Sequence, residues 1–133
     1  RRRDFADIPL FIEGDDPVVG QLARSLSRRV LEADSARRRR LHVAAVFGCN
    51  FVNHLWAIAD RLLRNDGMSF DLLEPLLRET LDKAVETGPC SGQTGPARRG
   101  DTRIMESHKR MLPPELADLY SRLSESIIKM YRQ

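Results

Sequence analysis

Cysteine, aromatic residues and net charge are all scarce in this chain of 133 residues. The two cysteines, Cys49 and Cys90, belong to no Cys-x-x-Cys pair, so we expect no disulfide framework and predict a reducing, cytoplasmic setting. The net charge is only +3, from 22 basic and 19 acidic side chains, which does not favour nucleic acid as a partner. His42 and His54 do not share a helix face, and no acidic residue is spaced with them as a ligand pair, so no metal site is expected.

Long uninterrupted hydrophobic runs are absent as well. The most apolar region, residues 41–63, is broken by several polar side chains, and charged residues make up 31% of the chain. A helix that spans a bilayer needs about 20 predominantly apolar residues. We therefore expect no association with a membrane.

The pattern of residues 1–33 predicts a short strand over residues 9–13, a helix over 17–27 and a second strand over 29–32. Asp16 followed by Pro17 is typical of a helix start. Two parallel strands under one helix leave strand edges and one sheet face uncovered. Residues 1–33 are therefore predicted to be the C-terminal end of a larger α/β domain, and the chain to be a piece of a longer protein.

A long helix is predicted over residues 36–64, on the order of 40 Å at 1.5 Å per residue. Its apolar residues follow the helical period on most sides, so we expect the middle of the helix to be buried nearly all round. A chain of this length has few elements with which to cover such a helix. We therefore expect a homodimer in which a second subunit completes the burial.

The remaining residues favour three more helical segments, which makes residues 34–133 an all-helical domain. One helix runs over residues 69–86, with Pro75 near its start splitting off a short segment. A loop rich in glycine and proline follows over residues 88–100, and Asp101 opens a helix that ends near Met111. The last helix is predicted over residues 115–131. The fold class is therefore mainly α, preceded by a short β-α-β segment.

Three polar residues, Asn50, Asn53 and His54, interrupt the apolar helix. On an ideal helix they lie within about 100° of one another, so all three can face one site. One interpretation is that they pair with loop backbone or across a dimer interface, because an unsatisfied buried polar group costs about 1–3 kcal/mol. The other is a polar pocket wall in which His54 gives or takes a proton.

The loop over residues 94–101 concentrates groups that suit a negatively charged ligand. Gly95 and Gly100 allow unusual backbone angles, and Arg98 and Arg99 lie beside the helix that Asp101 caps. We therefore predict an anion site for a carboxylate or phosphate, formed by Thr94, Gly95, Arg98, Arg99 and Asp101. The alternative is a plain loop whose arginines pair with acidic neighbours. His108 follows this loop and could face the same cavity as His54.

The segments HVAAVFGCNFVNH (42–54) and QTGPARRGD (93–101) resemble the domain of unknown function 2520 family. Proteins of this family have a Rossmann-like N-terminal domain and an all-helical C-terminal domain. The helical part resembles the C-terminal domains of 6-phosphogluconate dehydrogenase, ketopantoate reductase and pyrroline-5-carboxylate reductase. The resemblance implies that residues 5–33 close the Rossmann-like domain, that the helical domains form a dimer, and that Asn50, His54 and the 94–101 loop lie at the cleft between domains.

The resemblance further implies a parent oxidoreductase that uses NADP or NAD and acts on a small substrate bearing a carboxylate. The expected roles are catalysis for His54, oriented by Asn50, and substrate binding for Asn53, Thr94, Gly95, Arg98, Arg99 and Asp101. The glycine fingerprint of a dinucleotide site is absent, so this chain alone is expected to bind no cofactor and to be inactive. Several relatives carry a lysine on the long helix, whereas residues 36–64 contain none. The alternative function is a non-catalytic helical module for dimerisation or ligand sensing.

Overall fold

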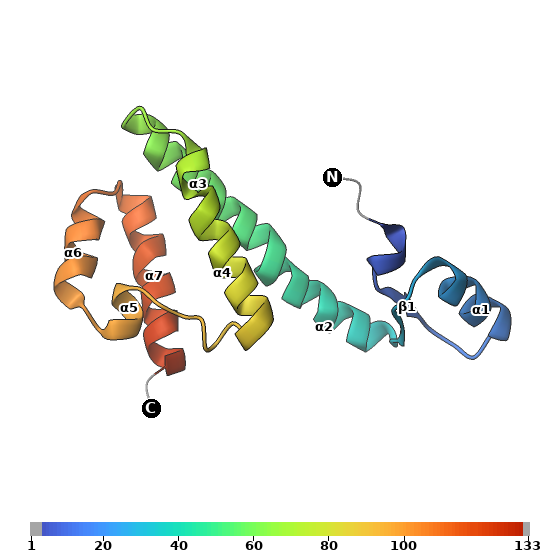
Figure 1. The fold of residues 1–133 in the computed structure, drawn as a ribbon. Helices are drawn as coiled ribbons and strands as arrows, with labels where there is room; N and C mark the ends of the chain where they lie inside the picture. Colours follow the sequence, from blue (N-terminus) through green and yellow to red (C-terminus); the bar gives the residue numbers. More distant parts are fainter. Residues whose placement is uncertain (1–3, 132–133) are drawn as a thin grey trace. The chain divides into compact units, whose positions relative to one another are not determined.

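The computed structural model describes residues 4–131, which belong to two compact units, Arg1–Phe70 and Asp71–Gln133 (Figure 1). This division lies beyond the long helix, so that helix groups with the strand–helix–strand segment. The expected domain boundary after residue 33 concerns the parent fold and stays a prediction.

The first unit begins with the predicted β-α-β segment. A short 3-10 turn, η1 (Phe5–Asp7), precedes β1 (Leu10–Ile12), α1 (Pro17–Leu26) and β2 (Val30–Glu32). The strands pair in parallel, with Leu10 opposite Val30. Asp16 caps α1 as predicted, because its side chain accepts a hydrogen bond from the Val18 N–H at 2.9 Å. The strand–helix–strand prediction is confirmed.

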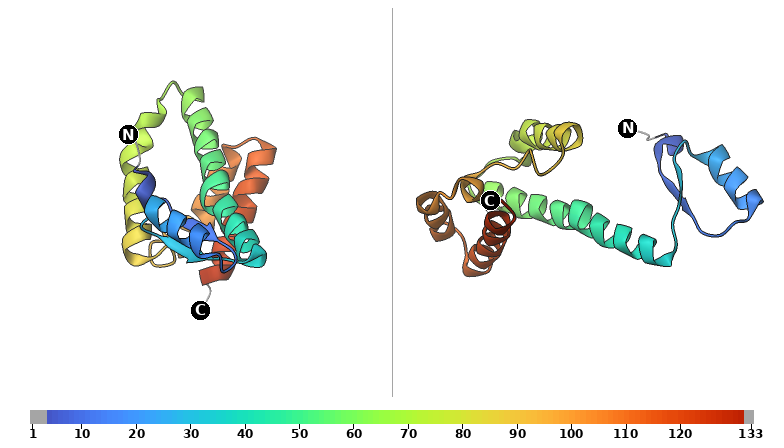
Figure 2. Two further views of the ribbon diagram at one scale, coloured as in Figure 1. Left: turned by 90° about the vertical axis from the view of Figure 1, so that its right-hand side faces the viewer. Right: turned by 90° about the horizontal axis from the view of Figure 1, so that it is seen from below.

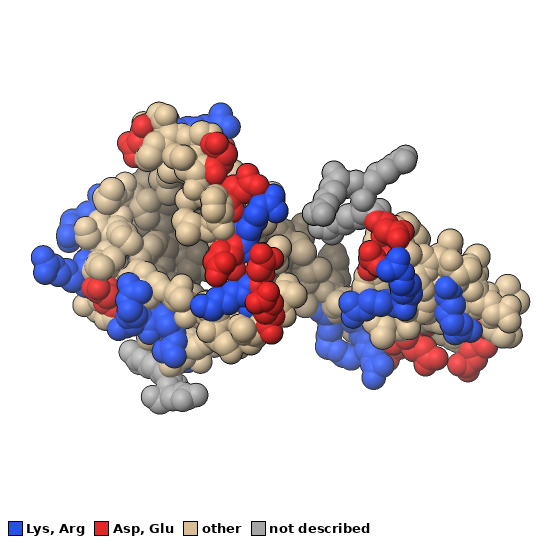
Figure 3. All heavy atoms as spheres, viewed as in Figure 1, with Lys and Arg blue, Asp and Glu red and all other residues tan. Residues whose placement is uncertain are grey.

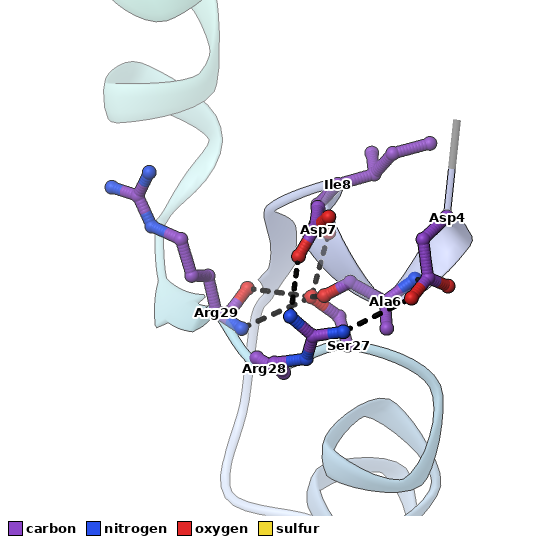
Figure 4. A network of polar contacts seen from close by, with 7 residues as sticks. All are labelled: Asp4, Ala6, Asp7, Ile8, Ser27, Arg28 and Arg29. Carbon is purple, nitrogen blue, oxygen red and sulfur yellow. Dashed lines mark hydrogen bonds and ion pairs between the residues drawn. The ribbon is translucent and has the colours of Figure 1, made fainter. Parts of the chain in front are cut away.

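Ser27 and Arg28 hold the start of the described chain against the turn between α1 and β2 (Figure 4). The buried Ser27 hydroxyl donates to the Ile8 carbonyl at 2.6 Å and accepts from the Arg29 N–H at 3.1 Å. The Arg28 guanidinium binds Asp4 at 3.0 Å and Asp7 at 2.8 Å. These ion pairs are exposed and contribute little to folding stability, so the hydrogen bonds of the buried Ser27 hydroxyl stabilise this region more.

The long helix is present and has three parts: α2 (Ser35–Ala45), η2 (Val46–Phe51) and α3 (Val52–Asn65). Both views of Figure 2 show it as one continuous helix. Its start is fixed by Asp34, which accepts from the Arg37 N–H at 2.7 Å, and Glu13 forms an ion pair with Arg38. The middle part, η2, is π-helical, so the constant turn of 100° per residue that the sequence analysis used does not hold there.

The expected burial of this helix is not found within the chain. Across the described residues 4–131, no residue of α2, η2 or α3 is buried, and Phe47 and Phe51 are 65% and 50% exposed. The predicted burial included a second subunit, so burial of the helix in a dimer stays a prediction. By length and composition alone, the helix Ser35–Asn65 is also long and apolar enough to cross a membrane. This was not predicted from the sequence, because only uninterrupted apolar runs were considered there.

The second unit contains most of η3 (Phe70–Leu73), whose first residue belongs to the first unit. It also contains α4 (Glu74–Thr87), α5 (Pro96–Arg99), α6 (Thr102–Arg110) and α7 (Pro114–Tyr131). Pro75 separates the short η3 from α4 as predicted. The predicted loop over residues 88–100 contains one unforeseen helical turn, α5. Helices α5, α6 and α7 contact one another and bury Ala97, Met105 and Ser124 (Figures 1 and 2).

Candidate anion site

A cavity of about 420 Å³ lies among α5, α6 and α7. Its size falls within the range of about 300–1,000 Å³ that is typical of small-molecule sites. Polar and apolar side chains both contribute to its wall. The lining residues are Ala97, Arg98, Arg99, Gly100, Thr102, Met105, Ile128 and Tyr131.

Local backbone chemistry explains how two adjacent arginines reach this cavity. Gly95 has φ +98° and Gly100 has φ +70°, which other residues rarely adopt, so the helical turn α5 can begin and end abruptly. Pro96 opens α5 with a preset φ. Asp101 then caps α6 by accepting from the Ile104 N–H at 3.0 Å. The predicted capping role of Asp101 is confirmed.

Arg98 lies against the ring of Tyr131, with its guanidinium carbon 5.0 Å from the ring centroid. This distance is within the range of a cation–π contact, which orients the guanidinium without neutralising it. Burial, followed by interaction with Cys90, raises the pKa of the Tyr131 phenol. The phenol therefore stays neutral at physiological pH and does not supply a competing anion for Arg98.

Neither cavity arginine forms an ion pair with any of residues 4–131. Elsewhere in the same part of the chain, arginines do have carboxylate partners, for example Arg78 with Glu74 at 2.7 Å and Arg122 with Asp118 at 2.8 Å. Figure 3 shows that basic and acidic side chains are intermixed on the face in view. The alternative of a plain loop, with its arginines paired to acidic neighbours, therefore finds no support among the described residues.

The cavity contains only part of the predicted substrate site. Arg98 and Arg99 line it, whereas Thr94, Gly95 and Asp101 do not. The Thr94 carbonyl accepts from the Gln93 side chain at 3.0 Å, and the Asp101 carboxylate is engaged by its own helix. These residues shape the loop that presents the arginines.

Sequence reasoning missed the cavity residues Met105, Ile128 and Tyr131. A signal was available, since Met105 lies one turn beyond the Asp101 cap and Ile128 and Tyr131 are three residues apart on the last helix. Their spacing alone indicates only the apolar faces of their helices. Only the packing of α6 against α7 shows that they also meet the arginines.

Asn50, Asn53 and His54 are exposed rather than buried. No side-chain hydrogen bond joins any of them to another residue within 4–131. They are not buried within the chain, and the interpretation that they pair across a dimer interface stays a prediction. Asn50 lies in the π-helical η2, and Asn53 and His54 follow in the first turn of α3. Such π-helical segments are rare and occur frequently at functional sites.

His108 does not line the cavity that holds the arginines. Its Nδ1 atom is 3.0 Å from the Tyr120 hydroxyl oxygen, and the two rings pack edge to face. A smaller cavity of about 150 Å³ lies beside this pair, between α6 and α7. The prediction that His108 shares a cavity with the anion site residues is not supported.

An acidic hollow lies at the carboxyl ends of β1 and β2, the edge where open α/β sheets commonly bind ligands. Glu13, Asp15, Glu32 and Asp34 line it, with Arg37 as the basic residue. The turn from β1 to α1 has one glycine, Gly14, in place of a glycine-rich loop. These residues do not fit a dinucleotide, because four carboxylates would repel its diphosphate.

The parallel β-α-β start followed by a mainly helical region is the fold of the end of a Rossmann-like domain joined to a helical region. Residues 8–127 match the family described as Domain of unknown function (DUF2520). The chain therefore belongs to this family.

Solved structures similar to the chain include the following two. BF3122 from Bacteroides fragilis, named "putative NADP oxidoreductase", is 44% identical over 97% of this chain, with a TM-score of 0.90. Protein TM1727 from Thermotoga maritima is 23% identical over 91% of this chain, with a TM-score of 0.76, and shows the same fold. This chain spans 52% of the length of each. A comparison with curated proteins finds no match.

Proposed function

We propose that this chain is the substrate-binding and dimerisation part of an NADP-dependent oxidoreductase that acts on a small carboxylate-bearing substrate. The name of the Bacteroides fragilis relative supports NADP as the cofactor of the parent protein, with NAD as the alternative. The observation that carries the proposal is the cavity with two arginines that have no carboxylate partner among the described residues.

Arg98 and Arg99 are the proposed carboxylate ligands. A guanidinium presents paired N–H donors that match the two oxygens of a carboxylate, which gives both affinity and a fixed orientation. Arg98 is already oriented by Tyr131, and Arg99 lines the same cavity. Thr94, Gly95 and Asp101 support the site by holding the loop and the start of α6.

His54 is the proposed acid or base, with Asn50 orienting it and Asn53 contributing a substrate contact. Imidazole is the side chain that most readily exchanges a proton near neutral pH. The exposure of all three residues leaves their polar atoms available to a ligand. This role requires that His54 and the arginines reach the same substrate molecule.

We further propose that a second copy of the chain covers the exposed apolar face of α2, η2 and α3. The face includes Phe47, Phe51 and Trp56. A bilayer is a poorer cover than a protein, because Asn50, Asn53 and His54 would have no water partners in hydrocarbon. The proposed setting is accordingly the cytoplasm, and no step is assigned to a cofactor bound by this chain.

The experiment combines cofactor and acid binding on the complete protein. We expect NADPH to bind, and small carboxylates to bind more weakly to the Arg98→Ala and Arg99→Ala variants by about tenfold or more each. Arg103→Ala is the matched control, since it removes an exposed arginine of the same helical group that does not line the cavity.

Two results would overturn the proposal: no binding of NADPH or NADH, or carboxylate binding that is equal in the three arginine variants. If acids bind through Arg98 but the protein oxidises NADPH with none of the carbonyl acids tested, the non-catalytic ligand-sensing module is the correct function.

A further inference from the structure

The cavity beside Arg98 and Arg99 is larger and more apolar on one side than a carboxylate alone requires. A carboxylate with one or two carbons would fill only a small part of about 420 Å³. The wall also includes the side chains of Met105 and Ile128 and the ring of Tyr131, which lies against Arg98. The cavity wall therefore offers hydrocarbon surface as well as the two guanidiniums.

The charged groups of the cavity wall favour an anion, because both are guanidiniums. Apart from the two arginines, the polar side chains in the wall are the hydroxyls of Thr102 and Tyr131. No Asp or Glu lines the cavity among the described residues. An ammonium group would find no carboxylate partner here, and a row of hydroxyls would lose water without gaining equivalent hydrogen bonds.

Apolar contact is the remaining source of affinity. Burying a methylene contributes about 0.8 kcal/mol, which corresponds to roughly a fourfold gain in affinity for each one that enters the cavity. Met105 is only 8% exposed, so its side chain is held by α6 and α7 and forms a fixed wall. The Tyr131 ring holds Arg98, so a cationic and an apolar group of the cavity wall lie directly against each other.

We propose that the acid bound at this site carries an apolar chain or branch of several carbons, which lies against Met105, Ile128 and the Tyr131 ring. The inference rests on the proposed function, because it assigns the carboxylate of the same ligand to Arg98 and Arg99. It excludes amino acids and sugar acids as the preferred substrate class.

Calorimetric titration of the complete protein, with and without saturating NADPH, tests the inference with matched acids. Acetate, butyrate and hexanoate form the chain-length series, and gluconate and 6-aminohexanoate have the same number of carbons as hexanoate but carry hydroxyls or an ammonium. We expect hexanoate to bind at least roughly tenfold more tightly than acetate. Gluconate and 6-aminohexanoate should bind no more tightly than acetate.

Variants of the apolar wall separate this inference from the proposed function. Tyr131→Ala and Ile128→Ala should each reduce the gain from acetate to hexanoate, whereas Tyr131→Phe, which keeps the ring, should retain it. Affinity that is independent of chain length but still lost in Arg98→Ala overturns the inference and leaves the proposed function standing. Hexanoate binding that persists in Arg98→Ala and Arg99→Ala overturns both, since the acid then binds somewhere else.

Discussion

The long helix and the α5–α7 group differ in whether their apolar side chains are buried within the chain. Helices α5, α6 and α7 contact one another and bury Ala97 and Met105, which are 7% and 8% exposed. The helix formed by α2, η2 and α3 buries none of its residues within the described chain, although it carries more large apolar side chains. The first region buries side chains through its own contacts, whereas the second leaves its apolar side chains exposed within the chain.

The strongest test of this contrast is a charge placed on the long helix. Phe51→Glu should abolish the dimer or weaken it by more than roughly thirtyfold, because an apolar interface residue is replaced by a charge that must be desolvated. Analytical ultracentrifugation of the complete protein measures the effect. Met111→Glu, at a residue that is 79% exposed outside the long helix, is the control and should leave the dimer intact. A wild-type monomer at high concentration would show that a second copy does not cover the helix.

Truncation of one side chain in each region should give a different dependence on protein concentration. Met105→Ala should lower the free energy of unfolding by about 2–5 kcal/mol, because it leaves a cavity among α5–α7. The loss should be the same at all protein concentrations. Phe47→Ala should instead lower the melting temperature by an amount that varies with concentration, since its contacts form on association. Differential scanning calorimetry over a hundredfold range of concentration distinguishes the two, and equal behaviour of both variants would contradict the contrast.

The buried hydroxyl of Ser27 provides a smaller effect within the first unit. Ser27→Ala should cost about 1–3 kcal/mol, because the Ile8 carbonyl and the Arg29 N–H both lose their partner. Ser25→Ala is the matched control, since that exposed hydroxyl bonds only within its helix, to the Leu22 carbonyl. Urea unfolding monitored by circular dichroism measures both variants. A Ser27→Ala protein as stable as Ser25→Ala would show that the Ser27 hydroxyl does not stabilise the fold.

The smallest expected effect concerns the cap at the start of the long helix. The hydrogen bond from the Arg37 N–H lowers the pKa of Asp34 below its usual value of 3.8. A lowered pKa in the folded state means that the cap stabilises fully above that value and is lost as the pH falls through the folded-state pKa. The difference in melting temperature between wild type and Asp34→Asn should therefore shrink between pH 5 and the acid limit of folding. A difference that stays constant with pH would show that the charge of Asp34 does not matter.

Much of the fold was predictable because its signals are local. Asp16, Asp34 and Asp101 each mark a helix start, and each side chain caps the helix that follows. Pro75 marks the break between η3 and α4. The π-helical η2 was not predictable, because an apolar helical pattern that contains Gly48 fits an ordinary α-helix equally well.

The candidate site was only partly predictable from the sequence. Arg98 and Arg99 stand out because glycines and a capping aspartate surround them. Tyr131 and Ile128 come from the last helix and carry no motif, so their part in the cavity depends on how α7 packs on α5 and α6. The exposure of Asn50 and His54 within the chain was not predictable, because hydrophobic periodicity identifies which face is apolar and not what covers that face.

The sequence by itself determined where most helices and both strands lie, the family, and the pair of arginines, since these depend on neighbouring residues and motif spacing. Only the tertiary structure decided that Arg98 lies over the Tyr131 ring, that Met105 and Ile128 complete the cavity, and that the long helix remains uncovered by its own chain. The physical reason is range: capping and backbone angles act within one helical turn, whereas a cavity and its exposure depend on contacts between segments far apart in the chain.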